Sequence, residues 1–356
     1  MTTPLIHEFD ACIRRDPAQR GLIATEPLFG PLCPNHLFAA ADHLSQFGQR
    51  TAIVTGFFIP AGDPPSAETD GPLGALVLAQ TLLALGIDSH IITDGFCFNA
   101  LNAAARAAGY PADRLVNYPD LYSALGHSEL GQSTMGDNTV TARWRHDFLR
   151  HESEKPLTHL IAVERVGPSH TLESQKQQAP GSAATVDRFA ECVPSEHRDH
   201  CHNMRGENID RFAGDLHRLF EEAPAFWPAV KTIGIGDGAN EIGMGAVAWE
   251  DLERRLSGEQ SGRVPCRIST DWNIIAGTSN WGAYALAASV ALLRGQFAAV
   301  APFDSRQQQA VLEQMVAHGP AVDGVTRRRE PTVDGLPFLT YIQPWEAIRR
   351  KLGLED

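Results

Sequence analysis

Four short apolar runs, each ending in a loop rich in glycine or acidic residues, constrain the fold of this chain more than any other feature. They lie at residues 51–54, 89–93, 160–163 and 231–236. Helical periodicity follows the first two runs, at residues 71–85 and 99–108. Strands that alternate with helices form a parallel sheet, because a parallel connection must cross over the sheet. The sequence therefore predicts an α/β fold with a mainly parallel sheet flanked by helices.

The regions outside this alternation predict extra helices at both termini. Residues 1–50 place apolar side chains at helical spacing, and the run at 279–294 has the same character. We therefore expect residues 1–50 to form a helical segment packed on the core and residues 51–356 to form the α/β domain. Within that domain, the polar stretch 168–200 is expected to be a mobile loop or insertion.

Composition excludes several classes of partner. The formal net charge of −13 repels phosphate backbones and anionic lipids, so we expect neither nucleic acid nor membrane as a partner. No apolar run approaches the roughly 18 residues that cross a bilayer, and no secretory signal pattern is visible at the N-terminus. The six cysteines include no CxxC pair. These observations predict a cytoplasmic protein with a small-molecule partner, and a homo-oligomer stays an open alternative to a monomer.

The loops that follow the predicted strands carry the candidate functional residues. In an open α/β sheet, ligands bind in the crevice beyond the carboxyl ends of the strands. Because parallel strands end at the same edge, four motifs are expected to line one crevice: TGFF (55–58), TDG (93–95), ERVG (164–167) and GDGANE (236–241).

The segment GIGDGANEIGMG (234–245) combines five glycines with Asp237, Asn240 and Glu241. We expect it to join a strand to a helix, with backbone N–H groups directed at an anion near the start of that helix. The oxygens of Asp237 and Glu241 are hard ligands suited to Mg²⁺ or Mn²⁺. The plainer alternative is that Asp237 and Asn240 cap the helix.

The motif ETDGPLG (68–74) stands before a predicted helix, where Asp70 or Thr69 would serve as N-cap and Pro72 would occupy the first turn. Capping does not require Glu68. Several carboxylates around one crevice repel each other unless a cation is present or their pKa values rise. We therefore predict a divalent cation, on the expectation that six acidic residues converge: Glu68, Asp70, Asp94, Glu164, Asp237 and Glu241.

Three other groups of residues have a functional and a structural interpretation. The stretch HRDHCH contains His197, His200, Cys201 and His202, which could ligate zinc, although a solvated polar loop is the favoured interpretation. Arg205 suits a substrate carboxylate or a surface ion pair equally well. The segments 271–273 and 278–281 either line the crevice or cap the following helix, and capping is favoured.

The motifs TGFFIP (55–60), ETDGPLGA (68–75), TDG (93–95), ERVG (164–167), NMRG (203–206) and GIGDGANEIGMG (234–245) together resemble the D-glutamate cyclase family, whose domain was long known only as one of unknown function. The matches keep their order and span residues 51–285, and the chain is similar to the stand-alone microbial form. The resemblance implies conversion of D-glutamate to 5-oxo-D-proline with loss of water, in an α/β domain with an acidic, metal-binding pocket. The His-rich stretch before NMRG departs from the family pattern.

This resemblance, combined with the residue types, gives a hypothetical set of roles. The divalent metal is assigned to Glu68, Asp70, Asp237 and Glu241. Catalysis is assigned to Glu164, Asp94 and Arg205. Substrate binding is assigned to Thr55, Gly56, Asn203, Arg205, Gly238 and Asn240. No nucleotide cofactor is expected.

Two other functions compete with cyclisation. The loop GDGANE is similar to the metal-binding loop of haloacid-dehalogenase-like phosphatases, and Thr93-Asp94-Gly95 is similar to part of their nucleophile motif. However, position 96 is phenylalanine, so the second aspartate that would protonate the leaving group is missing. A non-catalytic protein that binds a metal or an amino acid is the third possibility.

Overall fold

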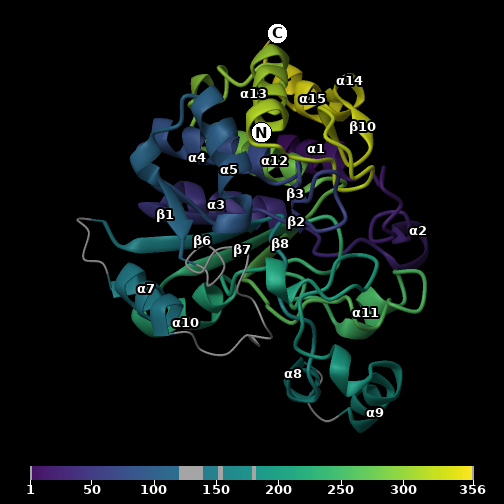
Figure 1. The fold of residues 1–356 in the computed structure, drawn as a ribbon. Helices are drawn as coiled ribbons and strands as arrows, with labels where there is room; N and C mark the ends of the chain where they lie inside the picture. The colour runs from purple at the N-terminus through teal and green to yellow at the C-terminus, as the bar shows by residue number, and fades with distance from the viewer. Residues whose placement is uncertain (1, 120–138, 151–154, 179–181, 355–356) are drawn as a thin grey trace.

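The computed structural model describes residues 2–119, 139–150, 155–178 and 182–354. Its centre is a six-stranded parallel sheet (Figure 1), with the strands in the order β5 (Leu115–Tyr118), β4 (Asp88–Asp94), β1 (Arg50–Thr55), β6 (Leu157–Val163), β7 (Lys231–Gly236) and β8 (Trp272–Ile275). In β1, Ile53 lies opposite Ile91 of β4 and Ile161 of β6. The predicted α/β class is confirmed. The order of connection reverses between β1 and β6, and ligands of doubly wound sheets bind at such a switch point.

Side chains of the strands alternate between two apolar cores, one on each face of the sheet. In β1, Ile53 belongs to the first core, whereas Ala52 and Val54 belong to the second. The first core is built by α1 (Thr2–Ile13), α3 (His36–Phe47), α4 (Pro72–Ala84), α5 (Gly95–Ala107), α12 (Ser279–Leu293), α13 (Ser305–His318), α14 (Phe338–Tyr341) and α15 (Gln343–Lys351). The second core includes residues of α7 (Thr139–Arg150), α10 (Arg218–Phe226) and α11 (Trp249–Glu253). The helices α1 and α15 pack together, as Figure 1 shows, so the expected terminal helices are present.

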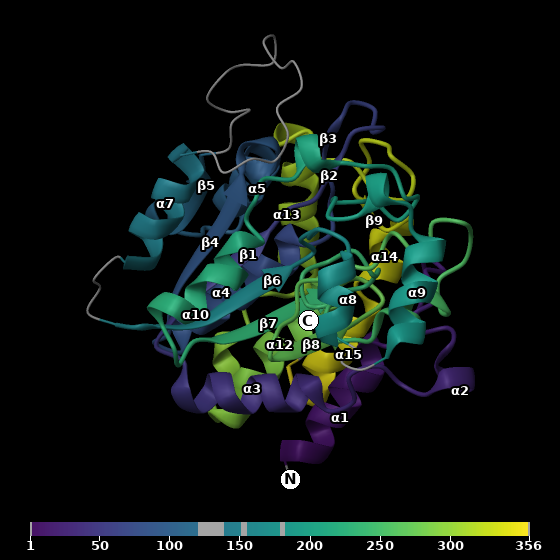
Figure 2. The same cartoon turned by 90° about the horizontal axis from the view of Figure 1, so that it is seen from below.

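The remaining elements lie outside the six-stranded sheet. They are the pairs β2 (Phe58–Ile59) with β3 (Ser66–Ala67) and β9 (Thr332–Val333) with β10 (Leu336–Pro337), and the short helices α2 (Glu26–Phe29), α8 (Leu172–Gln178) and α9 (Ala183–Cys192). Single 3₁₀ turns occur at Ala112–Arg114, Ser195–His197, Asp210–Phe212 and Phe297–Ala299. Figure 2 shows α8 and α9 side by side within the stretch 168–200, where a loop was expected; residues 179–181 lie outside the described chain.

The helix expected directly after the glycine-rich segment does not form, so that prediction was wrong. Residues 237–240 are bends, and the next helix, α11, begins only at Trp249. Tertiary contacts replace the helix, because Glu241 forms a β-bridge with Val166 and Gly243 forms one with Ser269. The backbone of Gly243 has φ +115°, a conformation that favours glycine. Asp237 and Asn240 therefore cap no helix at this position.

The segment 271–273 was predicted either to line the crevice or to cap a helix, but it lies largely in the edge strand β8. The segment 278–281 forms a helix cap, as the favoured interpretation predicted. The Thr278 side chain accepts a hydrogen bond from the N–H of Trp281 at the start of α12. The strands β5 and β8 were not predicted. Both are only four residues long, and a short edge strand leaves little periodic signal in a sequence.

The helices α4 and α12 cap each other, and this exchange fixes the floor of the crevice. The two oxygens of Asp70 accept hydrogen bonds from the N–H groups of Ser279 (2.7 Å) and Asn280 (2.9 Å) at the start of α12. In return, Asn280 Oδ1 accepts from the N–H groups of Gly71 (3.0 Å) and Gly74 (2.7 Å) at the start of α4. Asp70 is therefore a cap, but of α12 rather than of the helix that follows it in sequence.

Replacement of Asn280 by alanine should lower the free energy of unfolding by about 2–4 kcal/mol, because two buried N–H groups of α4 lose their acceptor. Urea denaturation measures this loss. Asp304→Ala is the control, since it removes one cap bond, at Gln307 of α13, and should cost about 1 kcal/mol. Equal losses of unfolding free energy in the two variants would show that the hydrogen bonds between α4 and α12 stabilise the fold no more than an ordinary helix cap does.

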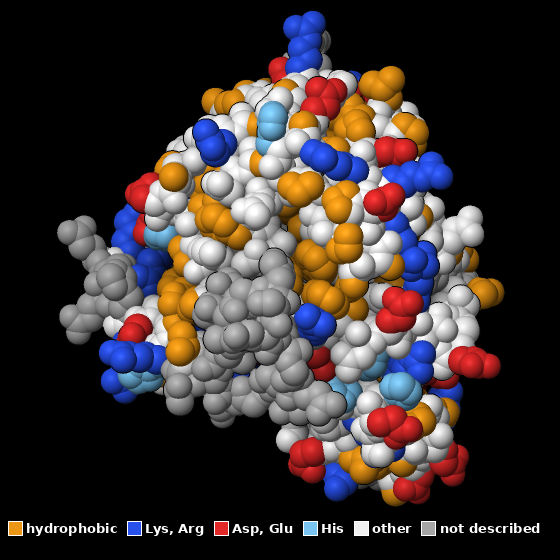
Figure 3. All heavy atoms as spheres, in the orientation of Figure 1, with side chains coloured by type: hydrophobic (Ala, Val, Ile, Leu, Met, Phe, Trp, Pro, Cys, Tyr) orange, Lys and Arg blue, Asp and Glu red, His pale blue; other side chains and the backbone are white. Residues whose placement is uncertain are grey.

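On the face shown in Figure 3, acidic and basic side chains are interspersed, without a broad basic area. No helix within the described ranges is long and apolar enough to span a membrane.

Candidate active site

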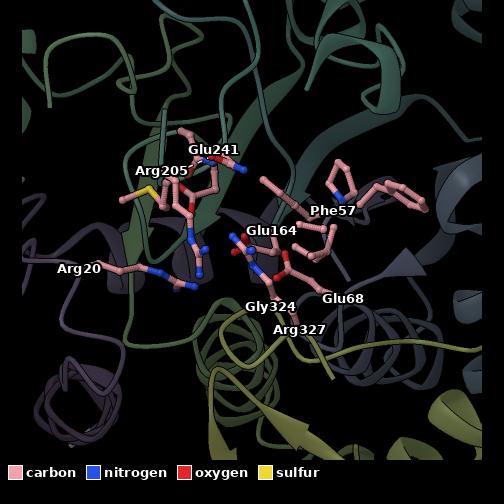
Figure 4. Close-up of a pocket in the computed structure, with 15 residues that line it drawn as sticks. Arg20, Phe57, Glu68, Glu164, Arg205, Glu241, Gly324 and Arg327 are labelled. Carbon is pink, nitrogen blue, oxygen red and sulfur yellow. Dashed lines mark hydrogen bonds between the residues drawn. The ribbon is translucent and has the colours of Figure 1, made fainter. Parts of the chain in front are cut away.

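A pocket opens beyond the carboxyl ends of β1, β6 and β7, beside the switch point of the sheet. It is lined by loops from distant parts of the chain (Figure 4), namely by Arg20, Phe57, Phe58, Ile59, Pro60, Ala61, Glu68, Glu164, Asn203, Met204, Arg205, Asn240, Glu241, Gly324 and Arg327. Phe57 and Glu164 come from the loops after β1 and β6, so the pocket lies where the topology predicts a ligand.

Three carboxylates meet beside this pocket, and one of them, that of Glu164, also lines it. One oxygen from each of Asp70, Glu164 and Asp237 lies within 4.8 Å of the others, and each residue is at most 4% exposed. Glu164 is the first residue after β6 and has φ +46°, an uncommon conformation for a non-glycine residue. Its Oε2 accepts a hydrogen bond from Ser279 Oγ at 2.6 Å. The spacing and the oxygen ligands suit a hard divalent cation.

Glu68 and Glu241 form part of the pocket wall next to these three carboxylates. Glu241 Oε1 accepts from the N–H of Gly238 at 2.7 Å, whereas Glu241 Oε2 and Glu68 Oε1 have no hydrogen-bond partner in the described chain. A Cβ atom at Gly324 would lie 2.1 Å from Glu68 Oε2, so a larger residue there would displace the Glu68 carboxylate. Buried oxygens without a partner are costly, which marks this wall as a place for a ligand or a cation.

Burial and mutual repulsion raise the pKa values of four of these acids. Burial, followed by the charge of Asp334, raises the pKa of Asp70 to about 7. The pKa values of Glu68 and Glu164 rise well above the ordinary value through burial and neighbouring carboxylates, and burial also raises the pKa of Glu241. At neutral pH, without a cation, some of these carboxyls therefore hold protons.

Arg20 provides a cation inside the acidic cluster. Its guanidinium forms an ion pair with Asp237 and a second one with Asp334 Oδ1 at 2.8 Å. A turn presents Arg20, because the carboxylate of Asp16 accepts hydrogen bonds from the N–H groups of Arg20 and Gly21, both at 2.8 Å. Burial opposes the charge of Arg20, but the surrounding carboxylates outweigh burial and raise its pKa. The N-terminal segment thus completes the site.

Most of the residues selected from the sequence do gather here. The three-carboxylate group contains Asp70, Glu164 and Asp237; the wall contains Glu68, Glu241, Asn203, Arg205 and Asn240. Sequence reasoning missed Arg20, Gly324, Arg327 and Asp334. No local pattern marks these four residues, because their role follows only from the way the chain termini fold over the sheet.

Asp94 lies apart from the pocket. It caps α5 by accepting from the N–H of Cys97 at 3.2 Å, and it forms an ion pair with Arg165 at 2.5 Å. Arg165 in turn donates to the carbonyl oxygen of Gly56 at 2.9 Å. Asp94 therefore holds the loop after β1 rather than facing a ligand. The residue that would be a phosphatase nucleophile is thus buried in an ion pair outside the pocket.

The predicted substrate-binding glycines are engaged within the protein. Gly56 has φ +110°, and a Cβ atom there would lie 2.7 Å from Cys97 Cβ, so packing alone requires glycine. The N–H of Gly238 is donated to Glu241. Thr55 Oγ1 is buried and has no hydrogen-bond partner among the described residues. The Thr55 hydroxyl, like Asn240 Oδ1, therefore keeps an unused hydrogen-bonding atom.

The side chains of the histidine-rich stretch contact neighbouring protein groups and do not line the pocket. His200 Nδ1 lies 2.5 Å from Asp210 Oδ2, and the ring of His197 contacts Arg263. Burial and nearby cations lower the pKa of His202 to about 4, and its carbonyl oxygen accepts from Asn240 Nδ2 at 2.8 Å. Among the described residues, only Asp70, Glu164 and Asp237 have the spacing of a metal site, which favours the non-metal interpretation of the histidines.

In protein freed of metal by a chelator, the free energy of unfolding should fall as the pH rises from about 4 to about 7. A carboxyl with a raised folded-state pKa stabilises the fold fully below its unfolded pKa and loses this contribution as the pH passes its folded pKa, about 7 for Asp70. Each titrating carboxyl contributes up to about 1.4 kcal/mol per pH unit. Glu68→Gln should flatten the dependence, whereas Glu259→Gln, at an exposed position, should not. Urea denaturation across this range that showed rising stability, or the same slope in all three proteins, would contradict the assignment.

Comparison with known proteins agrees with this geometry. The family model described as "D-glutamate cyclase-like, C-terminal" matches residues 9–179 and 190–348. The chain is also 29% identical over 288 residues to a protein of Homo sapiens named "D-glutamate cyclase, mitochondrial", and the match covers 81% of this chain. It covers 39% of the human protein, so the chain corresponds to about two fifths of that relative. The chain therefore belongs to the D-glutamate cyclase-like family.

Proposed function

We propose that this chain is a cytoplasmic lyase that converts D-glutamate to 5-oxo-D-proline. The observation that carries the proposal is the group of buried carboxyls beside a pocket at the switch point of the sheet, which Arg205 and Arg327 also line. Burial and neighbouring carboxylates raise the pKa of Glu164, a member of this group that lines the pocket. Membership of the family supports the same substrate.

The reaction joins two ends of one molecule. The amine nitrogen of D-glutamate attacks the carbon of the side-chain carboxylate, a C–N bond forms, and a C–O bond breaks. The two protons lost by the ammonium group leave with the departing oxygen as water. The protein must therefore hold the chain in a folded conformation, accept a proton from nitrogen and deliver a proton to oxygen.

Glu164 is suited to this proton transfer. It lines the pocket, and burial and the neighbouring carboxylates raise its pKa well above the ordinary value, which favours a group that both gives and takes a proton. Its Oε2 is held by Ser279, which leaves the other oxygen for the substrate. A protonated neighbour of Glu164, such as Glu68, would share a proton with the substrate's side-chain carboxylate and make its carbon easier to attack.

Arg205 is suited to the α-carboxylate of the substrate, which takes no part in bond making. Arg205 lies on the opposite wall from Glu68 (Figure 4), and its loop is held by Asn203, whose Oδ1 accepts from the N–H of Arg205 at 3.0 Å. A guanidinium offers two parallel N–H donors to one carboxylate.

The three carboxylates of Asp70, Glu164 and Asp237 fit a divalent metal such as Mg²⁺ or Mn²⁺, by their spacing and their oxygen atoms. Such an ion, when bound, polarises a carboxylate oxygen as a Lewis acid. Arg20 already neutralises part of the charge through Asp237. Glu164 belongs both to this group and to the pocket wall, so the two roles need separate tests.

Purified protein supplied with Mg²⁺ or Mn²⁺ should release 5-oxo-D-proline from D-glutamate. Asp237→Ala should abolish turnover while the protein stays folded. L-Glutamate and a generic phosphate ester are the comparison substrates. Phosphate release without 5-oxoproline would overturn the proposal in favour of a phosphatase, and binding of D-glutamate without turnover would favour a non-catalytic binding protein.

Glu164→Gln should lower kcat by about 10²–10⁴-fold, the range expected for loss of a general acid and base. The shift of the melting temperature on addition of Mn²⁺ separates its two roles. A variant that keeps this shift but loses turnover points to proton transfer, whereas loss of both points to metal binding. A kcat equal to that of the wild type would remove Glu164 from the mechanism.

A further inference from the structure

We propose that Arg327 determines substrate specificity by binding, together with Arg205, the carboxylate that does not react. The inference rests on the proposed function and names the ligand class of the same pocket, an amino dicarboxylate with a free α-carboxylate.

The guanidinium groups of Arg327 and Arg205 have no partner among the described residues. Both line the pocket, and Figure 4 shows their side chains directed into it from different loops. Neither guanidinium makes a hydrogen bond or ion pair within the described chain, whereas the guanidiniums of Arg20 and Arg165 pair with Asp237 and Asp94 respectively. Two unpaired guanidiniums beside a buried acidic cluster are complementary to an anionic ligand group.

The loop that carries Arg327 is held rigidly by one buried side chain. Asp323 is 0% exposed, and its two oxygens accept four hydrogen bonds of 2.7–2.9 Å from the loop. The donors are the N–H groups of Val325, Thr326 and Gly335 and the hydroxyl of Thr332. Arg327 itself has φ +63°. Arg327 is thus presented to the pocket before any ligand binds, which lowers the entropic cost of binding.

Backbone hydrogen bonds tie this loop to the acidic side of the pocket. The N–H of Thr69 donates to the carbonyl oxygen of Val322, and the N–H of Asp63 donates to that of Arg327, both at 2.9 Å. Glu68 lies between these two attachments in the sequence and faces Gly324 of the loop. The backbone of Arg327 is therefore held at a set distance from the backbone of Glu68, so a ligand with two carboxylates can reach both sides of the pocket only if its length suits that spacing.

This arrangement predicts discrimination by the α-carboxylate. The lactam 2-pyrrolidinone is 5-oxoproline without its carboxylate, so it fills the same space but offers nothing to the two arginines. In Arg327→Gln, binding of 5-oxo-D-proline should weaken about 10–100-fold, as expected for loss of a charged hydrogen-bonding partner. Binding of 2-pyrrolidinone should not change. NMR titration of the full chain measures both dissociation constants, including weak ones.

Arg328→Gln is the matched control. Arg328 is the next residue of the same loop, its side chain is 71% exposed, and it does not line the pocket. Its replacement should change neither dissociation constant. Arg205→Gln should imitate Arg327→Gln, and the double variant should lose less than the product of the two effects, because both side chains bind one carboxylate.

Binding of 5-oxo-D-proline to Arg327→Gln with wild-type affinity would overturn the inference, and so would equal weakening of both lactams, which would indicate general damage to the pocket. The inference would also be overturned if the wild type bound neither D-glutamate nor 5-oxo-D-proline. If binding depends on Arg327 but D-glutamate is not converted, the proposed function fails and the inference on Arg327 stands.

Discussion

Repulsion among buried carboxylates is the constraint to which the rest of this structure responds. Asp70, Glu164 and Asp237 are brought within 4.8 Å of one another, where like charges out of water are strongly unfavourable. Three features offset the cost. The N-termini of α4 and α12 present their positive dipole ends, the guanidinium of Arg20 enters the cluster, and raised pKa values keep protons on some of the acids.

The same constraint explains why the two ends of the chain converge on the site. Arg20 comes from the N-terminal segment, and its two ion pairs connect the glycine-rich loop, through Asp237, to the C-terminal hairpin, through Asp334. The segment 1–50, expected only to pack on the core, therefore also supplies a cation to the pocket. With the loop of Arg327, the terminal regions provide positive charge, while the strand ends provide most of the negative charge.

The parts of this arrangement that could be predicted from sequence depend on regular geometry. Strands that alternate with helices imply a parallel sheet, and parallel strands end at one edge, so Glu164 and Asp237 were expected to meet. The prediction of a helix after Asp237 was wrong, because contacts of Glu241 and Gly243 with distant segments override the local helix-start pattern. Asp94 shows a different limit, since an acidic residue after a strand can equally cap a helix. Arg20 and Arg327 could not be predicted, because only the folded chain places them beside the cluster.

A crystal structure of the protein with 5-oxo-D-proline tests the central claim most directly. The account predicts that the lactam lies in the pocket of Figure 4, with its carboxylate between Arg205 and Arg327 and its lactam carbonyl oxygen turned toward Glu164 and Glu68. Density for the ligand elsewhere on the molecule, or with the carboxylate turned toward the acidic cluster, would contradict the account.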